Sequence, residues 1–231
     1  MRRFACMLMF AAASLYAEQT VDRDQLSQTL GHLLVRHLGN SAFELNLDKV
    51  VAGIQDEQNG IPSPMSEEEY EQAVLAISQE LFEKTSQSNL EAAKEFLTKQ
   101  AKEDGICVIE PERLIYRLEH NGQGKAVTED SMPLIHYHGT LIDGTVFASS
   151  RESETPISLP LKHTIAGFAK GLVGMKEGEK RVLYIHPDLA YGVAGQLPPN
   201  SLLIFEVEIV KANSESEALA IESEAPSQPA S

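Results

Sequence analysis

Apolar residues between positions 26 and 54 recur at the three- and four-residue intervals of an amphipathic helix. They form two groups, which predict a helix over about 26–38 and a shorter helix over about 47–54. The apolar positions are Leu26, Leu30, Leu33, Leu34 and Leu38, then Leu47, Val50, Val51 and Ile54. Pro62 and Pro64 follow, so neither helix is expected to continue through them.

The segment between Ser66 and Gly105 predicts one long helix. Ser66 and Glu69 have the spacing of a capping box at its start, and no Gly or Pro interrupts the segment before Gly105. A helix over 67–103 would be about 55 Å long, at 1.5 Å per residue. Its apolar stripe is narrow and thins over residues 85–88.

Too few other apolar residues lie in the helical part of the chain to cover this stripe, because so short a segment buries little surface by itself. Two arrangements could cover the apolar stripe of the long helix. A second copy of the same segment would form a homodimer through residues 18–104, and this is the arrangement we expect. Alternatively, the long helix docks on the C-terminal part of its own chain.

From residue 105 the pattern changes to an alternation of apolar and polar positions with many β-branched side chains, which is typical of strands. Turn signals such as Asp143-Gly144 and Glu177-Gly178 separate these stretches. The expected strands cover 106–110, 113–120, 134–140, 145–147, 181–187 and 202–211, and a short helix covers 165–175. An antiparallel sheet must cover its apolar face with that helix, so the expected fold class is α+β.

The first residues have the pattern of a secretory signal peptide. Arg2 and Arg3 precede an apolar stretch over 4–15 that is too short to span a membrane, and polar residues follow Ala17. We expect cleavage after Ala17 and export from the cytoplasm; a buried N-terminal helix is the alternative. The expected domains are a signal peptide over 1–17, a helical dimerisation region with the linking helix over 18–104, a sheet domain over 105–212 and a disordered acidic tail over 213–231.

Composition and charge narrow the range of partners. Lys and Arg total 19 and Asp and Glu total 34, which gives a formal net charge of −15. So acidic a chain lacks the positive surface that phosphate backbones need, and nucleic acid is not an expected partner. Cys6 lies in the predicted signal peptide. Cys107 would then remain alone; we expect it to be buried and unreactive, with intermolecular pairing as the alternative.

Motifs for covalent or metal chemistry are missing from the sequence. It contains no nucleophile elbow, phosphate-binding loop or metalloprotease helix. His136 and His138 lie two positions apart on one face of an expected strand, which could start a metal site, but no third ligand is apparent nearby. We expect packed or solvated histidines, no metal and no cofactor. Aromatic residues at turns and element ends stand out instead, and by themselves they predict core packing.

Three ordered blocks of sequence, over 135–150, 165–179 and 185–207, place these aromatic residues in a recognisable context. The blocks resemble the FKBP-type peptidyl-prolyl isomerase family. Together with the signal peptide, the helical region and the linking helix, the chain looks like the macrophage infectivity potentiator branch of that family. The resemblance implies an antiparallel half-barrel sheet wrapped on a short helix, with a shallow apolar pocket between them.

The resemblance also implies roles for residues of the pocket. The implied catalytic residues are Tyr137, Phe147, Ile165 and Tyr191, and the implied substrate-binding residues are Ala148, Phe168, Leu197 and Phe205. Phe168 stands where the family usually has Trp. Ala148 stands where it usually has an Asp that polarises the pocket and binds ligand hydroxyls. For Tyr137 and Phe205, a role in core packing alone is the alternative.

The implied function is peptidyl-prolyl cis-trans isomerisation during protein folding in a bacterial cell envelope. The implied partners are proline-containing unfolded or nascent envelope proteins, and macrolide-type inhibitors of the family could bind the same pocket. The implied location is the periplasm, with outer-membrane association or surface exposure left open. The alternative function is that of a non-catalytic chaperone or surface-binding protein whose isomerase pocket has degenerated at Ala148.

Overall fold

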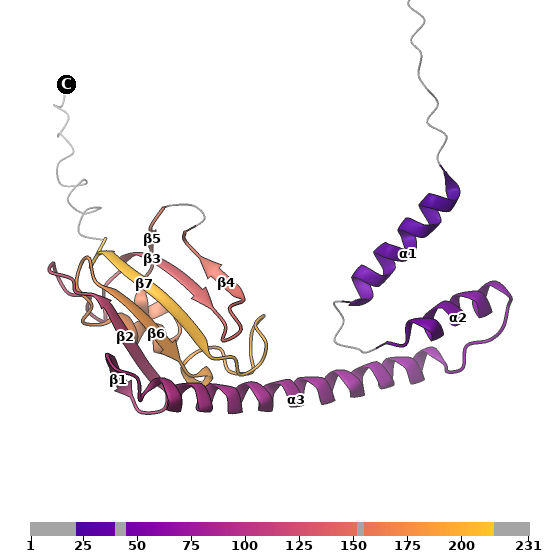
Figure 1. The fold of residues 1–231 in the computed structure, drawn as a ribbon, viewed down its shortest axis with the longest axis horizontal. Helices are drawn as coiled ribbons and strands as arrows, with labels where there is room; N and C mark the ends of the chain where they lie inside the picture. Colours follow the sequence, from indigo (N-terminus) through magenta and orange to yellow (C-terminus); the bar gives the residue numbers. More distant parts are fainter. Residues whose placement is uncertain (1–21, 40–44, 152–154, 215–231) are drawn as a thin grey trace, which may run out of the picture. The chain divides into compact units, whose positions relative to one another are not determined.

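A computed structural model describes residues 22–39, 45–151 and 155–214 of the chain (Figure 1). The expected signal peptide lies outside the described residues, and so does the tail from residue 215 onward. Contacts between residues divide the chain into two compact units, with the division after Glu67. Among the described helices, none combines the length and the apolar character that a membrane crossing requires.

The first unit contains two helices, α1 (Arg23–Gly39) and α2 (Leu47–Gln58), where the apolar periodicity predicts them. The side chain of Asn46 caps α2 by accepting a hydrogen bond from the N–H of Lys49 at 3.1 Å. In the single chain, Leu26 and the other leucines of α1 up to Leu34 are exposed, and α2 buries none of its side chains. Both helices therefore leave apolar surface uncovered.

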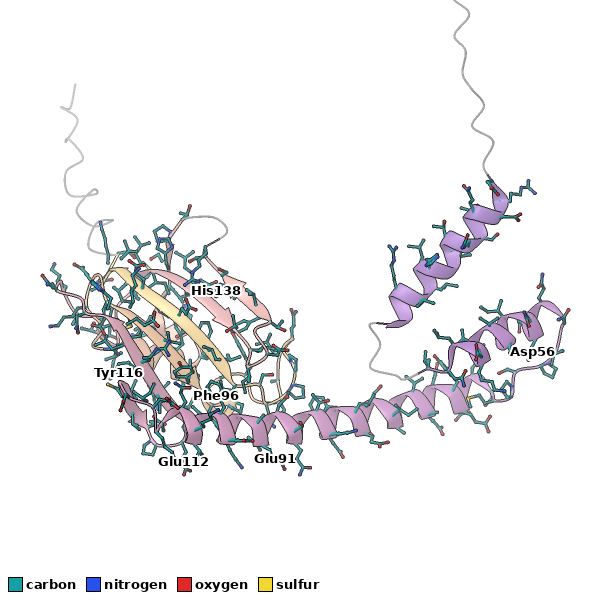
Figure 2. The ribbon with its side chains drawn as sticks, viewed as in Figure 1. Asp56, Glu91, Phe96, Glu112, Tyr116 and His138 are labelled. Atoms are coloured by element: carbon teal, nitrogen blue, oxygen red, sulfur yellow. The ribbon has the colours of Figure 1, made fainter. Side chains whose placement is uncertain are left out.

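Helix α3 (Glu67–Gln100) is the long helix that the sequence predicts. Its two parts differ in their surroundings. Ala93 and Leu97 are fully buried against the sheet, and the ring centroid of Phe96 lies 5.5 Å from that of Tyr184 (Figure 2). Tyr70, near the start of the helix, is 60% exposed in the single chain. The C-terminal part of α3 thus docks on the sheet of its own chain, the alternative that the sequence left open.

The second unit is built on one antiparallel sheet (Figure 1). Its strands are β1 (Ile106–Glu110), β2 (Leu114–His120), β3 (Leu134–Thr140), β4 (Val146–Ser149), β5 (Ile157–Ser158), β6 (Lys180–Ile185) and β7 (Leu203–Lys211). They are arranged in the order β1-β2-β6-β7-β3-β4, and β5 pairs with β3. This arrangement confirms the expected fold class.

The strand boundaries agree with the sequence prediction for β1 and β3, and β2 and β7 each begin one residue later than predicted. The other differences are at β4, β5 and β6. Strand β6 ends at Ile185, because Pro187 begins the short 3-10 helix η2 (Pro187–Leu189). Strand β4 starts one residue later than expected and continues to Ser149. Strand β5 was not expected, since two residues are too few to display an alternation.

Each face of the sheet is covered by a different helix. Leu183 and Phe205 belong to the core beneath the short helix α4 (Ala166–Leu172), while Val182 and Tyr184 face the opposite side and pack with Leu97 of α3. This explains why β6 is buried from Arg181 to Ile185 rather than at alternate positions. The sequence predicts the short helix on one face of the sheet and leaves docking of the long helix on the same chain as an alternative.

Glycines allow α4 to lie close to the sheet. A Cβ atom at Gly171 would lie 2.6 Å from Cδ1 of Leu183, and one at Gly167 would overlap Cγ2 of Ile185. These glycines weaken the helix by themselves. Their packing role explains why a helix forms here nonetheless.

Two further expectations concern single residues. Cys107, expected to be buried, is exposed because β1 is the outermost strand of the sheet and turns this side chain to solvent. His138 lies on β3 (Figure 2), and its Nδ1 is 3.0 Å from the hydroxyl of Ser149. His136 and His138 are half-buried, and among the described residues no cluster of His, Cys, Asp or Glu is arranged to hold a metal ion.

Candidate active site

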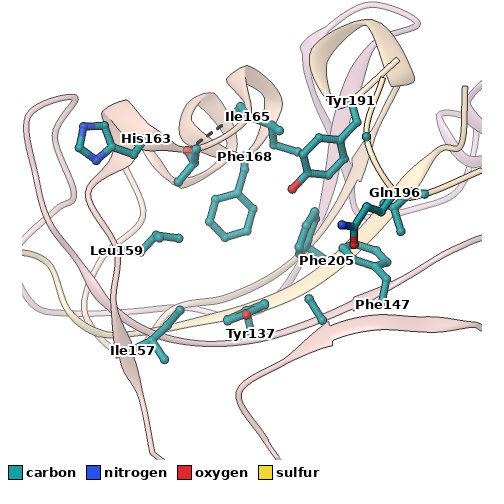
Figure 3. A pocket seen from close by; sticks show the side chains of 14 residues that line it. Tyr137, Phe147, Ile157, Leu159, His163, Ile165, Phe168, Tyr191, Gln196 and Phe205 are labelled. Atoms are coloured by element: carbon teal, nitrogen blue, oxygen red, sulfur yellow. Dashed lines mark hydrogen bonds between the residues drawn. The ribbon is translucent and has the colours of Figure 1, made fainter. Parts of the chain in front are cut away.

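A cavity of about 670 Å³, here called the aromatic cavity, opens between α4 and the sheet (Figure 3). Residues that line it come from β3, β4, β5, β7, α4 and the loop after η2. All the residues that the sequence analysis assigned to the pocket line this cavity. They are Tyr137, Phe147, Ala148, Ile165, Phe168, Tyr191, Leu197 and Phe205.

Phe205 is the centre of the aromatic cluster. Its ring centroid lies 4.8 Å from that of Phe168, 5.3 Å from that of Phe147 and 6.4 Å from that of Tyr137. The contacts with Phe168 and Phe147 are edge-to-face, an arrangement that aromatic pairs favour. Phe205 is 6% exposed, so it belongs to the core as well as to the cavity wall. Its packing in the core is thus observed, and its part in substrate binding stays a prediction.

The lack of a side chain at Gly139 makes room for two of these rings. Gly139 lies on β3 and pairs with Phe205 of β7 and Ala148 of β4. A Cβ atom at this position would lie 2.7 Å from Cζ of Phe147 and 3.0 Å from Cε1 of Phe205. The glycine thus lets both rings lie directly over the strand, and this sets the shape of the cavity wall.

Phe168 and Tyr191 face each other across the helix side of the cavity (Figure 3). Phe168, buried at 3% exposure, projects from α4 toward the rings of the sheet. Tyr191 follows η2 at the rim and is 47% exposed, and its hydroxyl points into the cavity. One side chain therefore supplies an apolar floor, and the other brings a hydrogen-bonding group to the edge.

Ile165 lines the cavity and is the N-cap residue of α4. The N–H groups at a helix start have no acceptor within the helix and can bind another oxygen. The preceding residue, Thr164, is held in place by its hydroxyl, which donates to the carbonyl of Leu161 at 2.8 Å. Ile165 can therefore offer a donor to a ligand as well as an apolar side chain.

The polar groups of the cavity are few. Among its described lining residues none carries a carboxylate, and Ala148 occupies the position where the sequence resemblance expects one. Just after β4, the hydroxyl of the buried Ser150 accepts a hydrogen bond from the N–H of Tyr137 at 2.9 Å. This contact holds the strand segment from which Tyr137 enters the cavity.

Several lining residues were missed by the sequence analysis, namely Ile157, Leu159, His163, Thr164, Gly195 and Gln196. A signal for the first two was present. Ile157 and Leu159 alternate with Ser158 between Pro156 and Pro160, which is the pattern of a very short strand at a sheet edge. His163 ends the short 3-10 helix η1 (Leu161–His163), and the other three lie on loops, where the apolar pattern does not indicate which way a side chain points.

Comparison with known proteins identifies the family. Residues 123–210 match the sequence family described as FKBP-type peptidyl-prolyl cis-trans isomerase, and residues 23–118 match the domain amino terminal to it. The chain is 45% identical over 200 residues to the peptidyl-prolyl cis-trans isomerase Mip of Chlamydia muridarum, covering 86% of this chain and 82% of the relative. The chain belongs to the FKBP-type peptidyl-prolyl cis-trans isomerases.

A solved structure of the family shares its architecture, and a further relative matches in sequence. The crystal structure of FkpA from Escherichia coli matches with a TM-score of 0.64 and 33% sequence identity, covering 83% of this chain and 97% of that chain. The outer membrane protein MIP of Legionella longbeachae is 29% identical over 201 residues, covering 83% of this chain and 86% of the relative. The expected family and isomerase activity are confirmed, while the roles of single cavity residues remain predictions.

Proposed function

We propose that this FKBP-type isomerase acts at the aromatic cavity, on proline-containing segments of unfolded or nascent proteins in a bacterial envelope. The observation behind this proposal is the cluster of rings around Phe205, open on one side and lined mostly by apolar groups. Such a site fits the ring of a proline and presents only a few hydrogen-bonding groups.

The reaction needs no bond to be made or broken, which suits a site of this composition. Rotation about an X-Pro bond has a barrier of about 18–20 kcal/mol, because it interrupts amide resonance. A catalyst must bind the twisted amide more tightly than either planar form. The rings of Phe147, Phe168 and Phe205 would hold the proline and exclude water, which favours the polar planar amide.

Two groups at the rim would hold the carbonyl oxygen of the residue before proline. Ile165 and Tyr191 both line the cavity, so the N–H of the first and the hydroxyl of the second would be these groups, and Tyr137 adds a second phenol on the sheet side. Hydrogen bonds that tighten as the amide twists lower the barrier. Ala148 provides no such group, so ligands that depend on an acid here, including macrolide-type inhibitors, should bind less tightly than in relatives that have the Asp.

The test of catalysis is the refolding of a protein limited by proline isomerisation. Uncatalysed isomerisation takes tens to hundreds of seconds, so acceleration by substoichiometric amounts of the chain is easy to detect. We expect the slow refolding phase to become faster in proportion to the chain concentration. A slow phase with an unchanged rate, at all concentrations tested, would contradict the proposal.

We further propose that the chain forms a homodimer through residues 18–104 and acts after export. The exposed leucines of α1 and the exposed apolar side chains of α2 are the surface that a second copy would cover. The apolar stretch over 4–15 supports export, and the name of the Legionella relative supports an envelope location.

Sedimentation tests the dimer directly. The chain beginning at residue 18 should sediment at twice the mass of one copy, and Leu30→Glu should shift it toward the monomer, because a charge would be placed in the interface. Gln28→Glu, which adds the same charge at an exposed polar position of α1, is the matched control and should remain dimeric. A monomeric wild-type chain at micromolar concentration would refute the dimer.

A further inference from the structure

We propose that Ser86 and Asn89 of α3 are positioning residues for the isomerase reaction, because they hold the loop that forms one wall of the aromatic cavity. This loop, here called the pocket loop, comprises residues 191–201 and includes Tyr191 and Leu197 of the cavity. The inference rests on the proposed site of catalysis and adds that the long helix helps to shape it.

Hydrogen bonds join the helix to the end of the pocket loop. The side-chain amide of Asn200 donates to the hydroxyl of Ser86 at 2.7 Å and to its backbone carbonyl at 3.3 Å. In the other direction, the side-chain amide of Asn89 donates to the backbone carbonyl of Pro199 at 2.8 Å. All three hydrogen bonds are partly buried, which makes them worth more than exposed ones.

Asn200 also binds the other arm of the pocket loop. Its φ of 55° lies in the left-handed region, where Asn is among the few tolerated residues. In this conformation its N–H donates to the carbonyl of Gly192 at 2.7 Å, next to Tyr191. A hold on Asn200 therefore fixes both ends of the segment that contains the cavity residues Gly195, Gln196 and Leu197.

The middle of the pocket loop has few other supports. Val193 is exposed, and so are Ala194, Gly195 and Gln196. Beyond the loop, Leu202 is buried in the same cluster as Ala93 and Leu97 of α3. The helix is thus one of the bodies against which the C-terminal arm of the loop rests.

The positions of the two residues on the helix explain a feature of the sequence. Ser86, Asn89, Ala93 and Leu97 follow one another at intervals of three and four, so they share one face of α3. The apolar stripe thins over 85–88 because the helix here meets the polar backbone of the loop instead of the apolar sheet. The polar residues continue the docking face rather than interrupt it.

The test compares single substitutions in the full chain. Ser86→Ala and Asn89→Ala should each raise KM for a short prolyl peptide by about two- to tenfold, the change expected from the loss of one partly buried hydrogen bond. The value of kcat should change less, because the rings around Phe205 stay in place. Ser88→Ala is the matched control: the same chemical change at an exposed position of the same helix should leave KM unchanged.

Two readouts separate positioning from a general loss of stability. Ser86→Thr keeps the accepting hydroxyl and should restore the wild-type KM. Amide exchange at Ala194 and Asn200, whose N–H groups bond within the loop, should become faster by a similar factor in Ser86→Ala and stay unchanged in Ser88→Ala.

The outcomes distinguish this inference from the proposed function. If the wild-type chain does not accelerate isomerisation, the proposed function fails. If the wild-type chain is active but Ser86→Ala and Asn89→Ala leave both KM and loop exchange at wild-type values, the role of the helix is refuted. Asn200→Gly keeps the left-handed backbone but removes the side-chain amide that binds Ser86. In this background, Ser86→Ala should cause no further change in KM. If the effects of the two substitutions on KM were fully additive, the role of the helix would also be refuted.

Discussion

Replacing Gly139 by Ala tests how tightly the wall of the aromatic cavity is packed. The added Cβ would lie 2.7 Å from Cζ of Phe147 and 3.0 Å from Cε1 of Phe205. Favourable carbon–carbon contacts begin near 3.5 Å, so each ring must move by roughly 0.5–1 Å. Because β3 lies behind them, both rings can move only toward the cavity or along the strand.

The magnitude of two effects follows from this displacement. Overpacking of this size costs about 1–3 kcal/mol of the free energy of unfolding. For a domain of this length, that cost corresponds to a fall in Tm of about 2–12 °C. A displacement of about 1 Å in a binding site can also lower kcat/KM by up to about a hundredfold, and we expect a fall of at least tenfold here.

Thermal unfolding followed by circular dichroism and a protease-free peptide isomerisation assay measure these effects. Gly53→Ala on α2 is the matched control, since its Cβ would meet nothing within 4 Å. The control should keep full activity and gain slightly in helix stability. If Gly139→Ala were as stable and as active as Gly53→Ala, the packing argument and the placement of the site against β3 would both be wrong.

Four other substitutions test separate parts of the account. Tyr191→Phe should lower kcat/KM about two- to tenfold while changing the free energy of unfolding by less than about 0.5 kcal/mol, because only the hydroxyl of a side chain at the rim is lost. An unchanged rate would remove this hydroxyl from the mechanism. Ala148→Asp should raise the affinity for a macrolide-type inhibitor by about tenfold or more in a calorimetric titration, since a hydrogen bond to a charged acceptor is regained; equal affinity would mean that Ala148 is no defect. Leu97→Ala should cost about 2–5 kcal/mol in urea unfolding, because Leu97 is fully buried between α3 and the sheet; a cost below about 1 kcal/mol would contradict the docking of the helix. Burial lowers the pKa of His186 from its ordinary value of 6.5, and the nearby Asp188 opposes this shift only in part. The unfolded chain therefore binds a proton more readily than the folded chain, so the free energy of unfolding should fall as the pH drops below about 6.5. His186→Asn, which keeps a side-chain acceptor for the N–H of Asp188, should lose this part of the pH dependence.

Much of the fold follows from local patterns in the sequence. The helices and the longer strands have clear periods of 3.6 and 2, and the aromatic residues at 137, 147, 168, 191 and 205 could be assigned to one site through the family resemblance. Strand β5 could not be found in this way, because its two residues form a strand only where β3 offers an edge for pairing.

The surroundings of α3 show where local patterns become insufficient. A narrow apolar stripe indicates that a helix is covered but not by what, and a second copy and the chain's own sheet leave the same pattern. Leu97 docks on the sheet, while Tyr70 remains exposed in the single chain. Residue contacts group the chain from Glu68 onward into one unit. The expected domain boundary after residue 104 therefore remains a proposal, based on where the cavity residues lie in the sequence. The exposure of Cys107 likewise depends on the position of β1 at the sheet edge, which no local sequence pattern reveals.

The central claim is that X-Pro bonds rotate in the aromatic cavity, and one measurement addresses it most directly. A two-dimensional NMR exchange spectrum of a short prolyl peptide, recorded with substoichiometric full chain and a mixing time below a second, detects cis-trans exchange that the free peptide undergoes only over tens of seconds or longer. We expect exchange cross-peaks with the wild-type chain and their loss with Phe147→Ala, which removes one wall of the cavity. Cross-peaks of equal intensity with both chains would place the reaction elsewhere on the molecule and contradict the account.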